Sequence, residues 1–216
     1  MKIGIIGAGN VGRALAKASI RAGHAITISA TNPEKAQRVA AEVGGSAAAS
    51  NRDAVADADA VILAVPFNAV NTIVNELGSE LDGKILIDVT NRFAPEHLEG
   101  ESNAELIQRM VPEGKVVKAI NTIFAAHQAD PLIDGIQLDG FVAGDDIDAK
   151  QKVLQFIGSL SFRPIDAGPL SMSRALEGMA VLNISLNMTN GWPWQTGWKL
   201  LGPTEGNVAT KGRAQE

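Results

Sequence analysis

The 216-residue chain contains no cysteine and no tyrosine, and only 4% of its residues are aromatic. Without cysteine, the chain cannot form disulfides, use a thiolate as a nucleophile, bind zinc through Cys ligands or hold an iron–sulfur cluster. Without tyrosine, a Tyr–Lys pair cannot serve as the catalytic proton donor. These absences exclude several enzyme classes and leave a chain dominated by aliphatic residues and glycine.

Basic clusters and long apolar runs are also lacking. The 19 basic and 24 acidic residues give a net charge of −5, and no Lys/Arg cluster is present, so we expect no nucleic-acid partner. No apolar run reaches the roughly 18 residues that a membrane helix needs. Gly7, Gly9 and Asn10 interrupt the apolar N-terminal stretch, which argues against a secretory signal. The sequence therefore predicts a cytoplasmic protein without a membrane partner.

Short apolar runs alternate with segments of helical periodicity along most of the chain. We expect strands at 2–6, 25–29, 58–65, 84–89, 116–120, 140–143 and 163–166, and helices at 10–22, 33–43, 69–77, 101–111, 147–160 and 171–190. This alternation predicts an α/β fold with a doubly wound, mostly parallel sheet and a small C-terminal helical part. We expect a sheet-bearing domain over residues 1–145 and a smaller one over 146–216, which ends in a helix and a Trp-rich tail.

A glycine-rich turn directly follows the first predicted strand and opens the first predicted helix. Residues 7–12 read Gly-Ala-Gly-Asn-Val-Gly, the G-x-G-x-x-G pattern of a Rossmann dinucleotide-binding domain. In that pattern the helix N-terminus offers free N–H groups to a pyrophosphate. We therefore predict cofactor contacts at five positions: Gly7, Gly9, Asn10, Val11 and Gly12. The alternative is a glycine-rich turn that binds no ligand.

The end of the second strand favours NADP over NAD. NAD-binding domains usually carry an acidic residue there, which binds the ribose 2′-OH. Here the chain continues with Ala30-Thr31-Asn32-Pro33-Glu34-Lys35, so no acid stands at the strand end. We predict that Thr31, Asn32 and Lys35 contact a 2′-phosphate. The alternative is a solvated helix N-terminus with a surface lysine.

Three later strands end in residues that would face the ligand, because ligands of such sheets bind outside the carboxyl ends of the strands. One strand ends at Ala64-Val65-Pro66, the next is followed by Asn91, and another by Asn121. An asparagine can offer a donor and an acceptor to a carboxamide. We predict that these five residues bind the cofactor, the two asparagines near the nicotinamide. Loop capping by asparagine is the alternative for each.

Residues suited to acid–base catalysis are scarce. His24 lies in a turn at the opposite edge of the sheet and His97 in a polar loop, so His127 is the one histidine expected near the ligand; a structural role is its alternative. Asp145 and Asp146 are better explained as caps of the next helix than as metal ligands. We therefore assign no catalytic residue and no metal site.

Three segments together are similar to one known family. Arg163–Arg174 reads Arg-Pro-Ile-Asp-Ala-Gly-Pro-Leu-Ser-Met-Ser-Arg, and Val116–Ile123 and Gly144–Asp146 match as well. With the glycine turn, these segments resemble the NADPH-dependent coenzyme F420 reductase family, nearly to residue 190. The resemblance implies direct hydride exchange between NADP(H) and a stacked deazaflavin or flavin-like acceptor, without a protein acid or base. It also implies a homo-oligomer, a dimer through the C-terminal region. The alternatives are a ferric or flavin reductase module and a non-catalytic NADP(H)-sensing protein.

Residue roles carried over from the resemblance concern the acceptor. The segment 121–125, with Ala125, would border the nicotinamide. Phe124, Leu170, Ser171 and Met172 would shape the acceptor pocket. The chain departs from the family at two positions: Thr31 stands where Arg is common, and Phe124 where Pro is often found.

Two features of the C-terminal part leave alternatives open. Asn183, Asn187 and Asn190 share one face of the last predicted helix. That face could be a polar wall of the acceptor pocket, a dimer seam or a solvent-exposed surface. The tryptophans that follow, Trp192, Trp194 and Trp198, could form a subunit or partner contact, a substrate platform or a small separate core.

Overall fold

The structure is a computed structural model that describes residues 1–92, 100–202 and 204. His97 lies outside the described residues. The strands are β1 (Lys2–Ile6), β2 (Ala25–Ser29), β3 (Ser46–Ala47), β4 (Ala60–Leu63), β5 (Ile85–Asp88), β6 (Lys115–Ala119), β7 (Leu132–Ile133), β8 (Ile136–Gln137), β9 (Asp139–Gly144) and β10 (Arg163–Gly168). The helices are α1 (Asn10–Arg21), α2 (Pro33–Val43), α3 (Asn51–Val55), α4 (Phe67–Leu77), α5 (Asn103–Met110), α6 (Ala125–Gln128), α7 (Ile147–Ser159) and α8 (Ser173–Asn190), with 3₁₀ turns η1 (Gly78–Leu81) and η3 (Leu170–Met172).

Eight strands form one sheet in the order β10-β9-β6-β5-β4-β1-β2-β3. In this order, all strands from β6 to β3 run parallel to one another. Strand β9 pairs antiparallel with β6, and β10 runs parallel to β9. The predicted mostly parallel Rossmann sheet is therefore confirmed. Strand β10, which follows residue 145, belongs to the same sheet as β1. The division of the chain into two domains at residue 145 stays a prediction.

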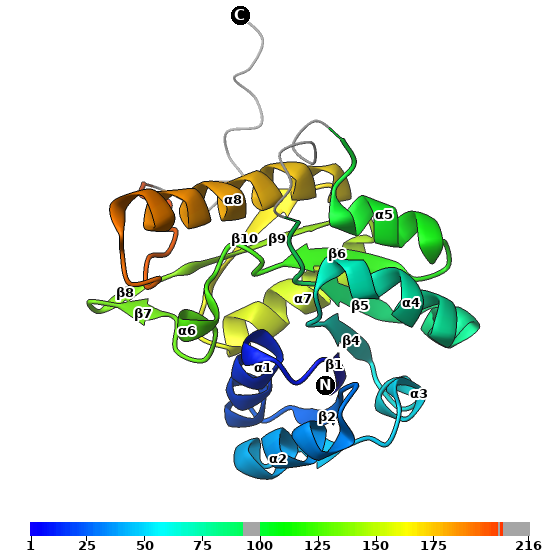
Figure 1. Cartoon of the computed structure of the whole chain (residues 1–216). Helices are drawn as coiled ribbons and strands as arrows, with labels where there is room; N and C mark the ends of the chain where they lie inside the picture. The colour runs from blue at the N-terminus through cyan, green and yellow to red at the C-terminus, as the bar shows by residue number, and fades with distance from the viewer. Residues whose placement is uncertain (93–99, 203, 205–216) are drawn as a thin grey trace, which may run out of the picture.

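Helices cover both faces of this sheet (Figure 1). On one face, α1 and α2 pack on residues such as Ile5 and Ile28, and α7 packs on β6, β9 and β10 within the same core, to which Ile62 of β4 belongs. On the other face, α4 and α5 pack on Val61 and Leu63. Successive residues of β4 thus enter opposite cores, as expected for a strand buried on both faces. In the described part of the chain, no helix is long and apolar enough to cross a membrane.

Several short elements were missed by the sequence analysis, and two strands, β4 and β5, are shorter than predicted. The missed elements are β3, α3, α6 and the two strands of a hairpin, β7 and β8, each with five residues or fewer, too short for a periodic pattern. The predicted strand 58–65 shrinks to β4 because its partner β1 ends at Ile6, opposite Leu63. Ala64 to Pro66 consequently leave the sheet and form the turn beside the glycine residues.

Helix α8 buries polar side chains and exposes apolar ones. Asn183 and Asn187 are buried, 4% and 1% exposed, against the segment that follows the helix. Asn187 Nδ2 donates to Thr196 Oγ1 at 2.6 Å, and the Thr196 hydroxyl donates to Asn183 Oδ1 at 2.6 Å. Leu182 and Met188 are exposed instead. Of the three alternatives, the solvent-exposed surface is therefore excluded for Asn183 and Asn187, because the Trp-rich segment covers them; Asn190 is exposed.

Candidate functional site

The glycine turn between β1 and α1 has two glycines that the chain itself requires. Gly7 has a φ of +113°, and a Cβ there would lie 2.2 Å from the carbonyl oxygen of Ala64. A Cβ at Gly12 would lie 1.9 Å from the carbonyl oxygen of Gly7. Both contacts are with backbone atoms, which cannot move aside cheaply. Gly7 and Gly12 therefore let the turn, α1 and the loop after β4 pack closely.

Gly9 differs, because a Cβ at this position would meet no atom of the described residues within 4 Å. It is the N-cap of α1, has an ordinary φ of −78°, and supplies no side-chain cap; no acidic residue stands in the first turn. By contrast, α2, α5 and α7 are capped by the side chains of Asn32, Ser102 and Asp146. The positive end of α1 therefore faces an open space with free backbone N–H groups.

Two pockets meet at this open helix end. One has a volume of about 850 Å³ and extends from Gly7 and Gly9 toward α2. The other, about 660 Å³, extends from Gly9 and Asn10 toward the ends of β4 and β5. Gly9, Ala64, Val65 and Pro66 line both pockets. An elongated ligand could fill both pockets with a phosphate group at the helix end.

The first pocket contains the three residues predicted to bind a 2′-phosphate. Thr31, Asn32 and Lys35 all line it, and its charged lining residues are Lys35 and Glu76. Asn32 Oδ1 accepts from the backbone N–H of Lys35 at 3.1 Å, so the side-chain oxygen of Asn32 caps α2. The Lys35 side chain is exposed and makes no ion pair with another described residue. This pocket can therefore accept an anionic group beside α2.

Helix α4 also contributes to the first pocket, and the sequence analysis did not assign it a role. Its lining residues are Ala69, Thr72, Ile73 and Glu76. Their i, i+3, i+4, i+7 spacing places them on one helix face. That spacing was visible in the sequence, but an amphipathic helix packed on a core gives the same pattern.

The second pocket is lined by Asn91 but not by Asn121. Asn91 Nδ2 donates to the Asn121 carbonyl oxygen at 2.8 Å, and Asn121 Nδ2 donates to Asn91 Oδ1 at 2.9 Å. Asn121 is only 4% exposed, and its Oδ1 atom is buried without a partner among the described residues. The structure thus places Asn91 at the pocket and Asn121 behind it, where Asn121 fixes the orientation of the Asn91 amide.

Of the remaining predicted cofactor residues, two line a pocket and two do not. Asn10 and Val11 line the second pocket. Gly12 lies beneath the turn, and Ala125 begins α6, outside the lining of either pocket. Phe124 also lies outside the lining; its ring packs edge-on against Trp194 with centroids 5.6 Å apart. The second pocket instead carries Arg92, whose guanidinium lies 5.0 Å from the centroid of Phe67.

Leu170, Ser171 and Met172 lie at the other edge of the sheet. Because β9 and β10 run opposite to β6, their carboxyl ends lie beside the amino end of β6. The backbone N–H of Leu170 donates to Asp145 there, and Asp146 pairs with Lys115 at the start of β6. Leu170 is buried in the core, whereas Ser171 and Met172 are exposed. The structure therefore does not bring these three residues to the two pockets.

His127, Asp145 and Asp146 all have structural partners. His127 Nε2 lies 2.9 Å from the carbonyl oxygen of Gln195, which ties α6 to the Trp-rich segment. The backbone N–H of Ala149 donates to Asp146, and this bond, with Lys115, holds the pKa of Asp146 below its usual value. Asp146 thus caps α7, as the sequence predicts, whereas Asp145 instead accepts from the backbone N–H of Leu170. Over residues 1–92, 100–202 and 204, no three His, Asp or Glu side chains gather as a metal site would require.

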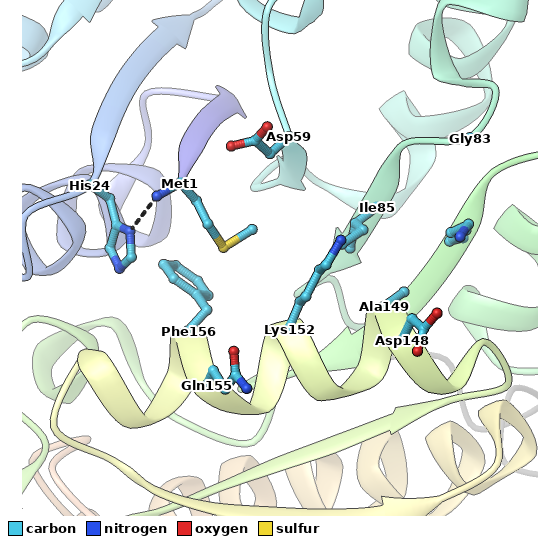
Figure 2. A pocket seen from close by; sticks show the side chains of 11 residues that line it. Met1, His24, Asp59, Gly83, Ile85, Asp148, Ala149, Lys152, Gln155 and Phe156 are labelled. Atoms are coloured by element: carbon cyan, nitrogen blue, oxygen red, sulfur yellow. Dashed lines mark hydrogen bonds between the residues drawn. The ribbon is translucent and has the colours of Figure 1, made fainter.

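A separate pocket of about 510 Å³ lies at the amino edge of the sheet, opposite the glycine turn (Figure 2). Asp148, Lys152, Gln155 and Phe156 reach it from α7. None of the glycine-turn residues lines it. At one end, His24 packs edge-on against Phe156 with ring centroids 5.2 Å apart, and its Nδ1 atom lies 3.2 Å from the Met1 amino group.

His24 should make stability depend on pH in the range just below neutrality. Burial and the nearby Met1 amino group lower the pKa of His24 below its ordinary value of 6.5. Between those two pKa values the unfolded chain binds more protons, so stability is full above about pH 6.5 and falls as the pH drops. We expect the unfolding temperature to fall more between pH 7.5 and 5.5 in the wild type than in His24→Gln, as measured by calorimetry. Equal decreases in both proteins would contradict this role.

Comparisons with known proteins identify relatives of this chain. The family model described as NADP oxidoreductase coenzyme F420-dependent matches residues 2–92. The F420-dependent NADP reductase of Methanothermobacter thermautotrophicus is 31% identical over 88% of this chain and 90% of its own length. A crystal structure from Arthrobacter sp. FB24, assigned as an F420-dependent NADP reductase, superposes with a TM-score of 0.82 at 30% identity, covering 93% of this chain and all of that one.

A second group of relatives consists of much longer proteins. Metalloreductase STEAP3 of Rattus norvegicus is 32% identical over 82% of this chain. The match covers 36% of that relative, so the chain spans about a third of the length of these curated metalloreductases.

Proposed function

The chain belongs to the coenzyme F420-dependent NADP oxidoreductase family, and from this premise we propose that it is an NADP(H)-dependent oxidoreductase whose acceptor is a deazaflavin or a flavin-like ring. When bound, NADPH supplies a hydride, and the acceptor takes that hydride together with a proton from solvent. The work of the protein is then to hold two planar rings in contact at a fixed distance.

The observation that carries this proposal is the open N-terminus of α1 between two connected pockets. A pyrophosphate at Gly9 would receive backbone N–H groups at the positive end of the helix. The adenosine half would occupy the pocket beside Thr31, Asn32 and Lys35, and the nicotinamide the pocket beside Asn91. The residues present therefore fit a dinucleotide, with glycine at the point where the backbone must approach it closely.

The second pocket supports hydride transfer without a protein acid or base. Among the described residues, its lining includes no histidine, aspartate or glutamate, and its one charged residue is Arg92. Asn91 is held in a fixed orientation by Asn121, so its amide can bind the nicotinamide carboxamide and select one face of the ring. The acceptor would then stack on the exposed face. We leave Leu170, Ser171 and Met172 out of the acceptor site because they lie at the opposite sheet edge.

The outer face of α8 supports an oligomer through the C-terminal region. Leu182 and Leu186, one helical turn apart on α8, are 50% and 37% exposed. Large apolar side chains exposed side by side on a helix are typical of a contact between subunits. We therefore propose a homodimer in which α8 forms the contact.

The metalloreductase relatives favour a second candidate function. The similarity covers most of this chain but only about a third of each metalloreductase, as expected for a reductase domain within a longer protein. In that case a flavin rather than a deazaflavin would accept the hydride.

Anaerobic mixing of the protein with NADPH and oxidised coenzyme F420 tests the proposal. We expect loss of the reduced-nicotinamide absorbance, matched mole for mole by bleaching of the deazaflavin. The same experiment with FMN or FAD in place of F420 supports the second candidate if only the flavin is reduced. NADPH binding without turnover of any acceptor would contradict both and indicate a sensing protein.

A further inference from the structure

The side chain of Lys118 is fully buried near the carboxyl end of β6. Its ammonium group donates to Asp88 Oδ2 at 2.9 Å, to Glu177 Oε1 at 2.7 Å and to the carbonyl oxygen of Thr90 at 2.6 Å. Asp88 is 0% and Glu177 1% exposed. Burying charged groups is costly, and apolar residues of similar size often give equal stability. The arrangement therefore calls for an explanation other than stability alone.

Every polar atom of Thr90 is held by this buried cluster. Its backbone N–H donates to Asp88 Oδ1 at 2.8 Å, and its carbonyl oxygen accepts from Lys118. Its hydroxyl oxygen accepts from Asn103 Nδ2 at 2.8 Å, and the backbone N–H of Asn103 donates to Glu177 at 2.9 Å. Thr90 and its neighbour Asn91 line the second pocket. The cluster thus fixes one wall of that pocket from behind.

Helix α8 supplies part of this support from 87 residues further along the chain. Glu177 holds Lys118 and α5, and the carbonyl oxygen of Leu176 accepts from Asn121 Nδ2 at 3.1 Å. Asn121 in turn orients Asn91. Two adjacent residues of α8 are therefore connected to both Thr90 and Asn91, whereas the pocket beside Lys35 is lined by no residue of α8, β5 or β6.

We propose that Lys118 and Glu177 are positioning residues for the nicotinamide half of the cofactor: they hold Thr90 and Asn91 in place, so the docking of α8 completes the second pocket. This role rests on the proposed function, because it assumes that the second pocket takes the nicotinamide. The adenosine half is bound elsewhere and does not depend on the cluster.

The test compares two ligands by isothermal titration calorimetry on the full chain. NADPH occupies both pockets, whereas 2′,5′-ADP reproduces only the adenosine half. In Glu177→Leu, we expect the Kd of NADPH to rise at least about tenfold, since a small misplacement at a site of this kind is costly. The Kd of 2′,5′-ADP should stay within about twofold of the wild-type value, because none of its contacts changes.

Two further variants separate positioning from a general loss of packing. Glu177→Gln keeps an acceptor for Lys118 and Asn103 and should retain most of the NADPH affinity. Ser173→Ala removes a buried hydroxyl from the same helix, where it contacts Ser102 rather than Lys118, and should leave both Kd values unchanged. If Glu177→Leu does not fold, Asn103→Ala removes the bond to the Thr90 hydroxyl and should show the same split between ligands at a smaller size.

Equal effects on the two ligands, or no effect on either, would overturn the positioning role while leaving the proposed function intact. If the wild type binds neither NADPH nor 2′,5′-ADP, the proposed function fails and the positioning role fails with it.

Discussion

Gly9→Ala is expected to weaken NADPH binding on the order of 100-fold and to leave the protein folded. Its Cβ would point into the space where the pyrophosphate must approach the N-terminus of α1. Loss of two charge-assisted hydrogen bonds, each worth about 1.5 kcal/mol or more, corresponds to that factor. The φ of −78° suits alanine, and an N-cap Gly→Ala change costs roughly 1 kcal/mol. Quenching of tryptophan fluorescence measures the affinity, and calorimetry should show the unfolding temperature lowered by only about 2–4 °C.

Gly12→Ala provides the matched contrast. Its Cβ would lie 1.9 Å from the carbonyl oxygen of Gly7, so the turn and α1 must separate, at a cost above roughly 3 kcal/mol. We expect the unfolding temperature to fall by about 10 °C or more. Identical behaviour of the two variants, either both unfolded or both binding NADPH normally, would show that Gly9 has no special relation to a ligand.

The wild type is expected to bind NADPH about 10- to 100-fold more tightly than NADH, and Lys35→Ala should remove most of that difference. Lys35 is the cationic residue lining the first pocket, and a hydrogen bond from a charged donor to a phosphate is worth about 1.5–3 kcal/mol. No acid stands at the end of β2 to hold a ribose 2′-OH or to repel a 2′-phosphate. Competition titrations with the two coenzymes measure the ratio.

Lys35→Arg is the control for this prediction, because it keeps the positive charge and offers a fork that suits phosphate. We expect it to retain the preference for NADPH. Equal affinity of the wild type for NADH and NADPH would remove Thr31, Asn32 and Lys35 from the proposed 2′-phosphate site.

The sequence predicts the fold well where local signals are strong. The glycine turn and Pro33 at the first position of α2 each fix an element boundary through local chemistry. The strands β1 and β2 therefore begin and end where their apolar runs do. The two pockets follow from the same local signals, because Gly9, Thr31 and Asn91 all lie at carboxyl ends of parallel strands.

The acceptor side of the site could not be predicted in the same way. An apolar run does not reveal strand direction, and the reversal at β9 carries Leu170 and Met172 to the amino edge of the sheet. Similarly, the buried position of Asn187 depends on Thr196, which returns to cover α8. Both facts concern contacts between distant segments, for which a single sequence holds no local signal.

The buried Lys118 illustrates the same limit. In the sequence it is the one polar residue of the run Val116–Ile120, a pattern that equally fits a strand with one solvent-facing position. Its partners Asp88 and Glu177 are 30 and 59 residues away. Only the packing of β5, β6 and α8 shows that the three charges share one buried site.

A crystal structure of the protein grown with saturating NADP⁺ tests the central claim most directly. We predict that the pyrophosphate lies within hydrogen-bond distance of the backbone N–H groups of Asn10 and Val11. The 2′-phosphate should lie beside Lys35, and the nicotinamide beside Asn91. A dinucleotide bound elsewhere, for example in the pocket lined by Lys152 at the amino edge, or no bound dinucleotide at all, would contradict the account.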